Sequence, residues 1–248
     1  MPSRRRGLRA WHHGRMRQGA VGHVRLVERH GLTVVEKRIA DPSRHHTEVL
    51  ALRALADSGM PVPRLIEVEP GSIVMTLMPG ERLDSAGADA RLDRLRASAV
   101  CLHRLHELIP PEGLPTAPDD ALTIRRYRDA GGPPLPFVTP RAGPLAFCHG
   151  DWTDGNVLAV DGNITAIIDW EAAHLGDPYR ELSRAAWAAA RKDPRSFDVL
   201  VEAYGADLAS VRDWVPIHAA ELWLWFDEAG PPEYLEQLTA ELAAWPAA

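Results

Sequence analysis

The sequence predicts an α+β protein of two lobes, a β-rich lobe over residues 1–79 and a larger helical lobe over residues 80–248. Short apolar runs separated by turn residues dominate the first part, and apolar residues at helical spacing dominate the second. Pro79-Gly80 interrupts the chain between the two parts. With 248 residues, of which 46% are hydrophobic, the chain can bury a core in one large domain or in two lobes that share a cleft.

Four strands and one helix are expected in the first lobe. The strand-like runs are Val24–Arg29, Leu32–Ile39, Leu65–Val68 and Ile73–Met78. His30-Gly31 and Pro70-Gly71 are turn dipeptides that join these runs in pairs. Between the pairs, Asp41-Pro42 predicts a helix start with an acidic N-cap, and Gly59 predicts the end of that helix.

The second lobe is predicted to be mostly helical. Asp89–Leu108 carries apolar residues on one side at helical spacing, which predicts an amphipathic helix. On that helix, His103 and His106 are expected to have packing or surface roles. Residues 110–144 contain nine of the 21 prolines, so an irregular connection is expected there, with a short helix at Asp119–Ala130. The pattern is again helical from residue 178 to the end.

Charge is distributed unevenly along the chain. Residues 1–65 contain 13 Lys/Arg against 5 Asp/Glu, whereas residues 171–248 contain 6 against 14. Two interpretations stay open: a salt-bridged surface with a basic tail, or a polyanion bound near the first part and a cationic partner near the last. No basic-aromatic interleaving or recognised nucleic-acid module occurs, so no nucleic-acid partner is expected.

The expected location is the cytoplasm. No run of about 18 uncharged apolar residues occurs, so no membrane partner is expected. The basic first residues lack the apolar stretch of a secretory signal. Cys101 and Cys148 are expected to be reduced core thiols, and no Cys/His cluster has the spacing of a zinc site.

Residues 147–171, FCHGDWTDGNVLAVDGNITAIIDWE, combine a hairpin with three polar residues. The apolar runs 157–160 and 164–168 flank Asp161-Gly162-Asn163, which predicts a hairpin turn. Pairing about a centre between residues 162 and 163 places Asn156 opposite Asp169, with Cβ atoms about 4.5–5.5 Å apart. An amide oxygen and a carboxylate at that distance suit Mg²⁺. Asp151 lies close enough in sequence to orient an attacking hydroxyl and to accept its proton.

The alternative interpretation of this segment is a plain hairpin with turn-forming Asp, Asn and Gly at its ends. That interpretation suits each residue singly, but the joint pattern favours a site. HGDWTDGN and IIDWE resemble the HGD-x₄-N loop and the I-D-W/F-E/D motif of the aminoglycoside phosphotransferase and choline kinase superfamily, relatives of the protein kinases. The following GDPYREL resembles that family's G-D-P-x-x-D-L helix start, with Glu181 in place of the usual Asp.

This resemblance implies a bilobal, protein-kinase-like fold and phosphoryl transfer from ATP or GTP to a small-molecule hydroxyl with Mg²⁺. It implies that Asp151 is the catalytic base, that Asn156 and Asp169 are the metal ligands, and that His149 supports the loop. It also implies that Lys37 contacts the nucleotide phosphates and that Glu48, on the first helix, holds Lys37.

Lys37 is one of only two lysines beside 26 arginines, and its compact ammonium suits phosphate contact. The alternative interpretations are a surface lysine at a strand end and, for Glu48, a first-turn glutamate favoured by the helix dipole. The rest of the predicted nucleotide site matches the family less closely. Gly19 and Gly22 in QGAVGHV are candidates for the phosphate loop, although no full G-x-G-x-x-G is present. Thr76 and Met78 are candidates for the hinge that contacts the base.

The predicted acceptor site lies in the helical part. Its candidate residues are Glu171, Trp223, Asp227 and Glu228. An acidic rim with aromatic faces suits a polyamine, an amino sugar or another sugar-bearing molecule. The alternative is that the tryptophan packs in the core and that the acids are solvated.

The predicted function is that of a small-molecule kinase that phosphorylates an antibiotic, aminoglycoside-like or otherwise sugar- or amine-bearing, and confers resistance or self-protection. The alternatives are a metabolic kinase for a choline- or homoserine-like amino alcohol or a sugar, and a kinase-like protein that binds nucleotide without transfer. A protein kinase is disfavoured because HRD, DFG and APE motifs are missing. A monomer or weak dimer is expected.

Overall fold

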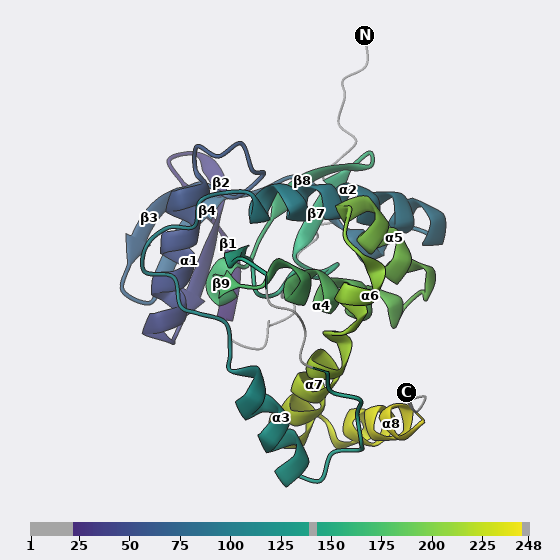
Figure 1. Ribbon diagram of the computed structural model, residues 1–248. Helices are drawn as coiled ribbons and strands as arrows, with labels where there is room; N and C mark the ends of the chain where they lie inside the picture. Colours follow the sequence, from purple (N-terminus) through teal and green to yellow (C-terminus); the bar gives the residue numbers. More distant parts are fainter. Residues whose placement is uncertain (1–21, 139–142, 245–248) are drawn as a thin grey trace.

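A computed structural model describes residues 22–138 and 143–244 (Figure 1). The first part is an antiparallel sheet of strand order β1-β2-β4-β3, with one helix between the second and third strands. Its elements are β1 (Gly22–Arg29), β2 (Leu32–Ile39), α1 (Pro42–Leu55), β3 (Leu65–Glu69) and β4 (Ser72–Thr76). All four predicted strands and the predicted helix are therefore present.

Local chemistry explains the boundaries of these elements. His30 and Gly31 both have positive φ angles, of 51° and 77°, which makes the two-residue turn that matches strand twist. The Asp41 side chain accepts hydrogen bonds from the N–H groups of Ser43 at 2.8 Å and Arg44 at 3.5 Å, so it caps α1 as predicted. Helix α1 ends at residue 55, before Gly59, which lies in the following turn.

The second part contains α2 to α8 and two small sheets. The helices are α2 (Ala88–His106), α3 (Asp120–Asp129), α4 (Pro178–Ala190), α5 (Arg195–Tyr204), α6 (Leu208–Arg212), α7 (Val215–Ala229) and α8 (Pro232–Ala243). The strands are β5 (Glu81–Arg82), β6 (Ala146–Cys148), β7 (Val157–Val160), β8 (Asn163–Ile167) and β9 (His174–Gly176), in the sheet orders β5-β7-β8 and β6-β9. Short 3₁₀ turns occur at Leu83–Ser85 and Trp170–Ala172. No helix in the described ranges is both long and apolar enough to cross a membrane.

The predicted register of the β7–β8 hairpin is wrong. Its turn is the dipeptide Asp161-Gly162, with φ angles of 49° and 83°, so Asn163 already belongs to β8 and pairs with Val160. The register also shifts between residues 158 and 159, leaving Thr165 as an extra residue in β8. The prediction assumed a longer turn and no bulge. The shorter turn and the bulge therefore change which residues of β7 and β8 lie opposite one another.

This shift changes the relation between the two predicted metal ligands. The N–H of Ile168 donates to the carbonyl of Asn156 at 2.9 Å, so residue 168, not Asp169, continues the hairpin opposite Asn156. Asp169 follows the strand in a left-handed conformation, with φ 72° and ψ 62°. Asn156 and Asp169 are therefore not a cross-strand pair: Asn156 lies opposite Ile168, and Asp169 is the next residue.

Two hydrophobic clusters organise the interior. The larger cluster joins the first sheet and α1 to α2, α4 and α5, with fully buried residues such as Ile39, Leu52, Leu102 and Leu182. The smaller cluster lies between α3, α7 and α8, which form a separate group at the lower end of Figure 1. Trp187 of α4 packs against both clusters. The helical group thus has its own core and meets the rest of the protein along α4.

Candidate active site

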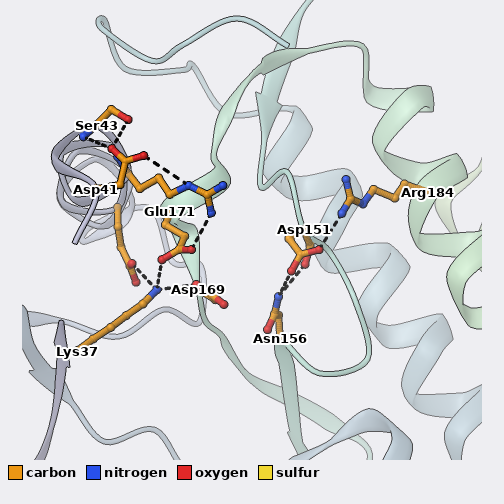
Figure 2. A network of polar contacts seen from close by, with 10 residues as sticks. Lys37, Asp41, Ser43, Asp151, Asn156, Asp169, Glu171 and Arg184 are labelled. Carbon is orange, nitrogen blue, oxygen red and sulfur yellow. Dashed lines mark hydrogen bonds and ion pairs between the residues drawn. The ribbon is translucent and has the colours of Figure 1, made fainter. Parts of the chain in front are cut away.

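The buried Lys37 lies at the centre of three carboxylates, of which Glu48 is buried and Asp169 is partly exposed (Figure 2). Its Nζ is 2.6 Å from Glu48 Oε2 and 2.5 Å from Asp169 Oδ1. Strand β2 supplies the lysine, α1 supplies Glu48, and the segment after β8 supplies Asp169. Lys37 and Asp169, which are 132 positions apart in the sequence, are therefore in direct contact. The structure thus brings together Lys37, for which the resemblance implies phosphate contact, its implied partner Glu48, and Asp169, which the resemblance implies as a metal ligand.

The charges in this cluster depend on one another. Burial alone would lower the pKa of Lys37, but the charges of Glu48 and Asp169 outweigh burial and raise that pKa above its ordinary value. Burial raises the pKa of Glu48 to about 7, although Lys37 opposes the shift. The lysine is thus held as a cation, and it needs this carboxylate partner because an unpaired buried charge is strongly unfavourable.

Glu171 belongs to the same cluster. Its Oε2 is 3.0 Å from Lys37 Nζ, and its Oε1 accepts a hydrogen bond from Arg44 NH1 at 3.1 Å. Oε2 is buried and has this ion pair but no hydrogen bond of good geometry. Carboxylate oxygens of Glu48, Asp169 and Glu171 all lie within 4.8 Å of one another. The structure therefore places Glu171 beside the predicted phosphate site, away from the other candidate acceptor residues on α7.

Asp151 and Asn156 are joined by hydrogen bonds within the loop that precedes β7. The Asn156 Nδ2 group donates to the Asp151 carbonyl at 2.9 Å and to Asp151 Oδ2 at 2.8 Å. Because both bonds use the amide nitrogen, the amide oxygen of Asn156 is directed away from Asp151 and is the atom left for a cation. The loop thus presents one carboxylate and one amide oxygen side by side.

His149 and Gly150 hold this loop against the strand that carries Asp169. His149 Nε2 lies 3.0 Å from the Ile168 carbonyl, and the imidazole packs against Trp170 with ring centroids 4.5 Å apart. Gly150 has a φ of 84°, and a Cβ at this position would lie 2.0 Å from the Ala172 carbonyl oxygen. Only glycine fits here, which explains why the loop can approach so closely.

Glu181 of α4 holds the backbone of the loop at His149 and Gly150. It accepts hydrogen bonds from the backbone N–H groups of His149, at 3.0 Å, and of Gly150. His106 Nε2 lies 2.9 Å from the same carboxylate, and His106 Nδ1 lies 2.7 Å from the Tyr204 hydroxyl. Burial opposes the ionised form of Glu181, but the hydrogen bond and charge of His106 lower its pKa to about 2.

Sequence reasoning did not find the role of His106. It expected packing or a surface role, whereas the side chain is only 3% exposed and bonded at both ring nitrogens. The one signal in the sequence was that Glu181 stands where the family usually has Asp. The contact between Glu181 and His106 could not be inferred from it, because that contact depends on how α2 packs against α4.

Of the predicted nucleotide-loop and hinge residues, Gly22 and Thr76 lie in strands of the first sheet, and Met78 follows β4. Gly22 begins β1 opposite Ile39, and Gly19 lies outside the described residues. Thr76 ends β4, where its N–H donates to the Arg64 carbonyl at 2.9 Å, and its hydroxyl lies 3.6 Å from the Met78 sulfur. The Thr76 donor is therefore already used within the sheet.

Comparison with known proteins agrees with this arrangement. Residues 24–214 match the model of a family described as the phosphotransferase enzyme family. The chain belongs to this family. It is therefore an enzyme that transfers a phosphoryl group to a hydroxyl group, and the predicted resemblance is confirmed. No curated protein matches the chain in sequence.

Solved structures with similar folds extend over nearly all of this phosphotransferase. The macrolide 2'-phosphotransferase MphH from Brachybacterium faecium is 20% identical, with a TM-score of 0.64 over 93% of this chain and 90% of that chain. A choline/ethanolamine kinase family protein from Mesorhizobium loti is 18% identical, with a TM-score of 0.65 over 89% and 87% of the two chains. A thermostable mutant of aminoglycoside phosphotransferase APH(4)-Ia, in a ternary complex with AMP-PNP and hygromycin B, is 14% identical, with a TM-score of 0.65 over 92% and 90%. These likenesses confirm the predicted α+β, kinase-like fold.

Arg184 was missed by the sequence analysis. It projects from α4 of the phosphotransferase, and its NH2 donates to Asp151 Oδ1 at 3.1 Å. Figure 2 shows it on the side of Asp151 opposite to Lys37 and Asp169. The carboxylate of Asp151 is therefore held by Asn156 through one oxygen and by Arg184 through the other. An arginine on a predicted helix gives no sequence signal of such a contact.

Next to Arg184, a buried polar layer separates the two hydrophobic clusters. Arg180 bonds to Asp120 of α3 at 2.8 Å and to Glu221 of α7. His218 lies 2.8 Å from the Arg180 carbonyl through Nε2 and 3.1 Å from Glu221 through Nδ1. This layer joins α4 to the helical group by ion pairs, in addition to the apolar contact of Trp187.

The remaining predicted acceptor residues contact the helical group instead of the loop at Asp151. Trp223 is 5% exposed and its indole N–H donates to Thr239 of α8 at 2.8 Å, so it has the packing role that was weighed as the alternative. Asp227 is exposed, and Glu228 forms an exposed ion pair with Arg126 of α3. Their role in acceptor binding stays a prediction.

Proposed function

We propose that this phosphotransferase is a Mg²⁺-dependent small-molecule kinase that transfers the γ-phosphoryl group of ATP or GTP to an acceptor hydroxyl. The observation that carries the proposal is the position of Lys37, 2.6 Å from Glu48 and 2.5 Å from Asp169. The lysine is charged, fixed, and adjacent to the carboxylate that the family resemblance assigns to the metal. The AMP-PNP complex of a protein with a similar fold supports a nucleotide donor.

The donor atoms of the site fit Mg²⁺. Asp169 offers a carboxylate and Asn156 offers its amide oxygen, and hard oxygen ligands of this kind are what Mg²⁺ prefers. The buried Glu171 oxygen that lacks a hydrogen bond shows that this cluster has more negative charge than its own donors satisfy. When bound, the ion supplies charge neutralisation on the phosphate oxygens.

The residues of the chain then divide the work. Lys37 binds phosphate oxygens, and Glu48 keeps its ammonium in place. Asp151 orients the acceptor hydroxyl and accepts its proton as the oxygen–phosphorus bond forms and the bond to the nucleoside diphosphate breaks. Because Glu181 and Gly150 fix the loop before the reaction, little reorganisation is needed in the transition state.

The proposed acceptor is an antibiotic, since proteins of similar fold include a macrolide and an aminoglycoside phosphotransferase. A metabolic acceptor is the second candidate because Arg184 places a cation at the acceptor side of Asp151, where an aminoglycoside would bring further positive charge. A protein that binds nucleotide without transfer is disfavoured by the complete set of polar residues.

The test is Mg²⁺-dependent release of ADP and GDP in the presence of aminoglycosides, macrolides, peptide and nucleoside antibiotics, choline, homoserine and simple sugars. Mass spectrometry would detect the gain of one phosphoryl group by the acceptor. Product that is lost in Asp151→Ala supports the proposal. Tight nucleotide binding with no product from any acceptor would favour the binding protein.

A further inference from the structure

We propose that Arg184 binds an oxyanion of the acceptor, so that the acceptor is a hydroxyl compound that also carries a carboxylate or phosphate group. This inference rests on the proposed kinase function and specifies the substrate class of the same site. An acidic antibiotic and a metabolic hydroxy acid share this chemistry, and the experiment below separates them.

The position of Arg184 is the first argument. Its guanidinium contacts Asp151 at 3.1 Å from the side opposite to Lys37, which is the side left for the acceptor once the phosphates occupy the lysine side (Figure 2). Only this one N–H contact is formed within the described residues, and the side chain is 41% exposed. A guanidinium has five N–H donors in a planar fork, so most of the fork remains for an oxyanion.

The neighbouring charges are the second argument. The acids nearest to Arg184 on α3 and α7, Asp120 and Glu221, are already paired with Arg180. Burial lowers the pKa of His218, although Glu221 opposes the shift, so the imidazole is neutral. Asp151 is the one carboxylate that Arg184 contacts among the described residues, and the charge of Arg184 also helps to lower the pKa of Glu221.

The reaction itself is the third argument. When the acceptor hydroxyl gives its proton to Asp151, its oxygen bonds to the γ-phosphorus and the nucleoside diphosphate leaves. Asp151 then becomes a neutral carboxylic acid, and Arg184 loses its counter-charge. An oxyanion on the acceptor, bound to the free part of the fork, keeps the guanidinium paired throughout the transfer. A cationic acceptor would meet Arg184 with no such compensation.

The experiment compares acceptors that differ only in the anionic group: glycerate with glycerol, homoserine with homoserinol, and carboxylate-bearing antibiotics with their methyl esters. Aminoglycosides and choline form the cationic set. We expect turnover with anion-bearing acceptors, and in Arg184→Gln a KM for the acceptor raised by about 10- to 100-fold with a smaller change in kcat. Which anion-bearing acceptor reacts distinguishes an antibiotic from a metabolite. Arg191→Gln is the matched control, because Arg191 lies at the end of α4 and pairs with Glu241.

Turnover restricted to cationic or uncharged acceptors would overturn the inference while leaving the kinase proposal intact. An equal loss of kcat in Arg184→Gln for every acceptor, water included, would overturn it too, because it indicates a residue that only positions Asp151. If no acceptor reacts, calorimetric titration with glycerate and inorganic phosphate decides, with and without Mg²⁺ and AMP-PNP. Binding weakened by about 10- to 100-fold in Arg184→Gln supports the inference; equal or absent binding in both proteins contradicts it. Failure to bind AMP-PNP would count against the kinase proposal alone.

Discussion

The two sides of Asp151 differ in how they are built. On the lysine side, Lys37, Glu48, Asp169 and Glu171 form a dense ionic cluster in which every charge has an opposite partner within about 3 Å. On the acceptor side, Arg184 makes one contact and is 41% exposed. The lysine side is held together by ion pairs before a ligand arrives, whereas the acceptor side has unused N–H donors.

This difference separates common chemistry from specificity. A triphosphate and its cation present the same oxygens to any kinase, so a closed and preorganised cluster suits them. An acceptor varies between enzymes, and an exposed fork on a helix can be changed without disturbing the phosphates. The following predictions test how far the two sides are independent.

The largest effect is expected from Asp151→Asn, which keeps the shape of the side chain and removes its basicity. Turnover should fall by about 10²- to 10⁴-fold, while the affinity for nucleotide with Mg²⁺ changes little. Asp169→Asn should weaken metal-dependent nucleotide binding as well. Steady-state kinetics and calorimetry of both proteins would check this, and similar, near-normal activity in both would remove the assigned roles.

Replacing Lys37 with Met should destabilise the fold as well as nucleotide binding. Three neighbouring carboxylates would lose their shared cation, so the free energy of unfolding should fall by about 3–5 kcal/mol. Glu48→Gln is the control and should cost less, because Lys37 keeps Asp169 and Glu171. Urea unfolding without Mg²⁺ measures both, and a smaller loss for the lysine variant would show that the cluster is not held by its cation.

Glu181→Gln should lower stability at neutral pH by about 3 kcal/mol, because the carboxylate has a pKa of about 2 in the folded protein and about 4.5 when unfolded. A lowered pKa gives stability that is present above pH 4.5 and is lost as the pH falls toward 2. The wild type should therefore lose stability over this range more steeply than the variant. Unfolding free energies measured at several pH values would check this; parallel curves would contradict it.

The smallest effect is expected from Glu228→Gln on α7. Its ion pair with Arg126 is exposed, so stability should change by less than about 0.5 kcal/mol. If acceptor binding is confined to the region of Arg184, the acceptor KM should stay unchanged. A raised KM would instead support the predicted acidic rim on α7 and extend the acceptor side to that helix.

The elements of the fold and the lysine side were predictable because their signals are local. Asp41-Pro42 starts α1 by its own chemistry, and the HGD and IDWE segments are contiguous in the chain. The hairpin register was not predictable, because the Asp161-Gly162 turn and the Thr165 bulge depend on backbone angles that several sequences could adopt. Asp169 was predicted as a metal ligand, which stays a prediction, whereas its contact with Lys37 and its left-handed backbone were not foreseen.

The acceptor side was harder to predict because its contacts join distant helices. Arg184 reaches Asp151 only when α4 packs beside the loop, and His106 reaches Glu181 only when α2 packs against α4. Trp223 illustrates the opposite error: an aromatic residue near acids was considered for binding, although it fills the small core between α3, α7 and α8. Residue type can suggest that such a side chain binds a ligand, but it cannot determine which face of the helix is buried.

The polar layer around Arg180 has a consequence for the history of such proteins. Since α3, α7 and α8 possess a core of their own and attach to α4 through the ion pairs of Arg180 and the contact of Trp187, substitutions deep inside that core need not alter the phosphate chemistry. The sequence of this small core can therefore change within the limits of its own packing, while the ion pairs of Arg180 and the contact of Trp187 keep the helical group attached to α4.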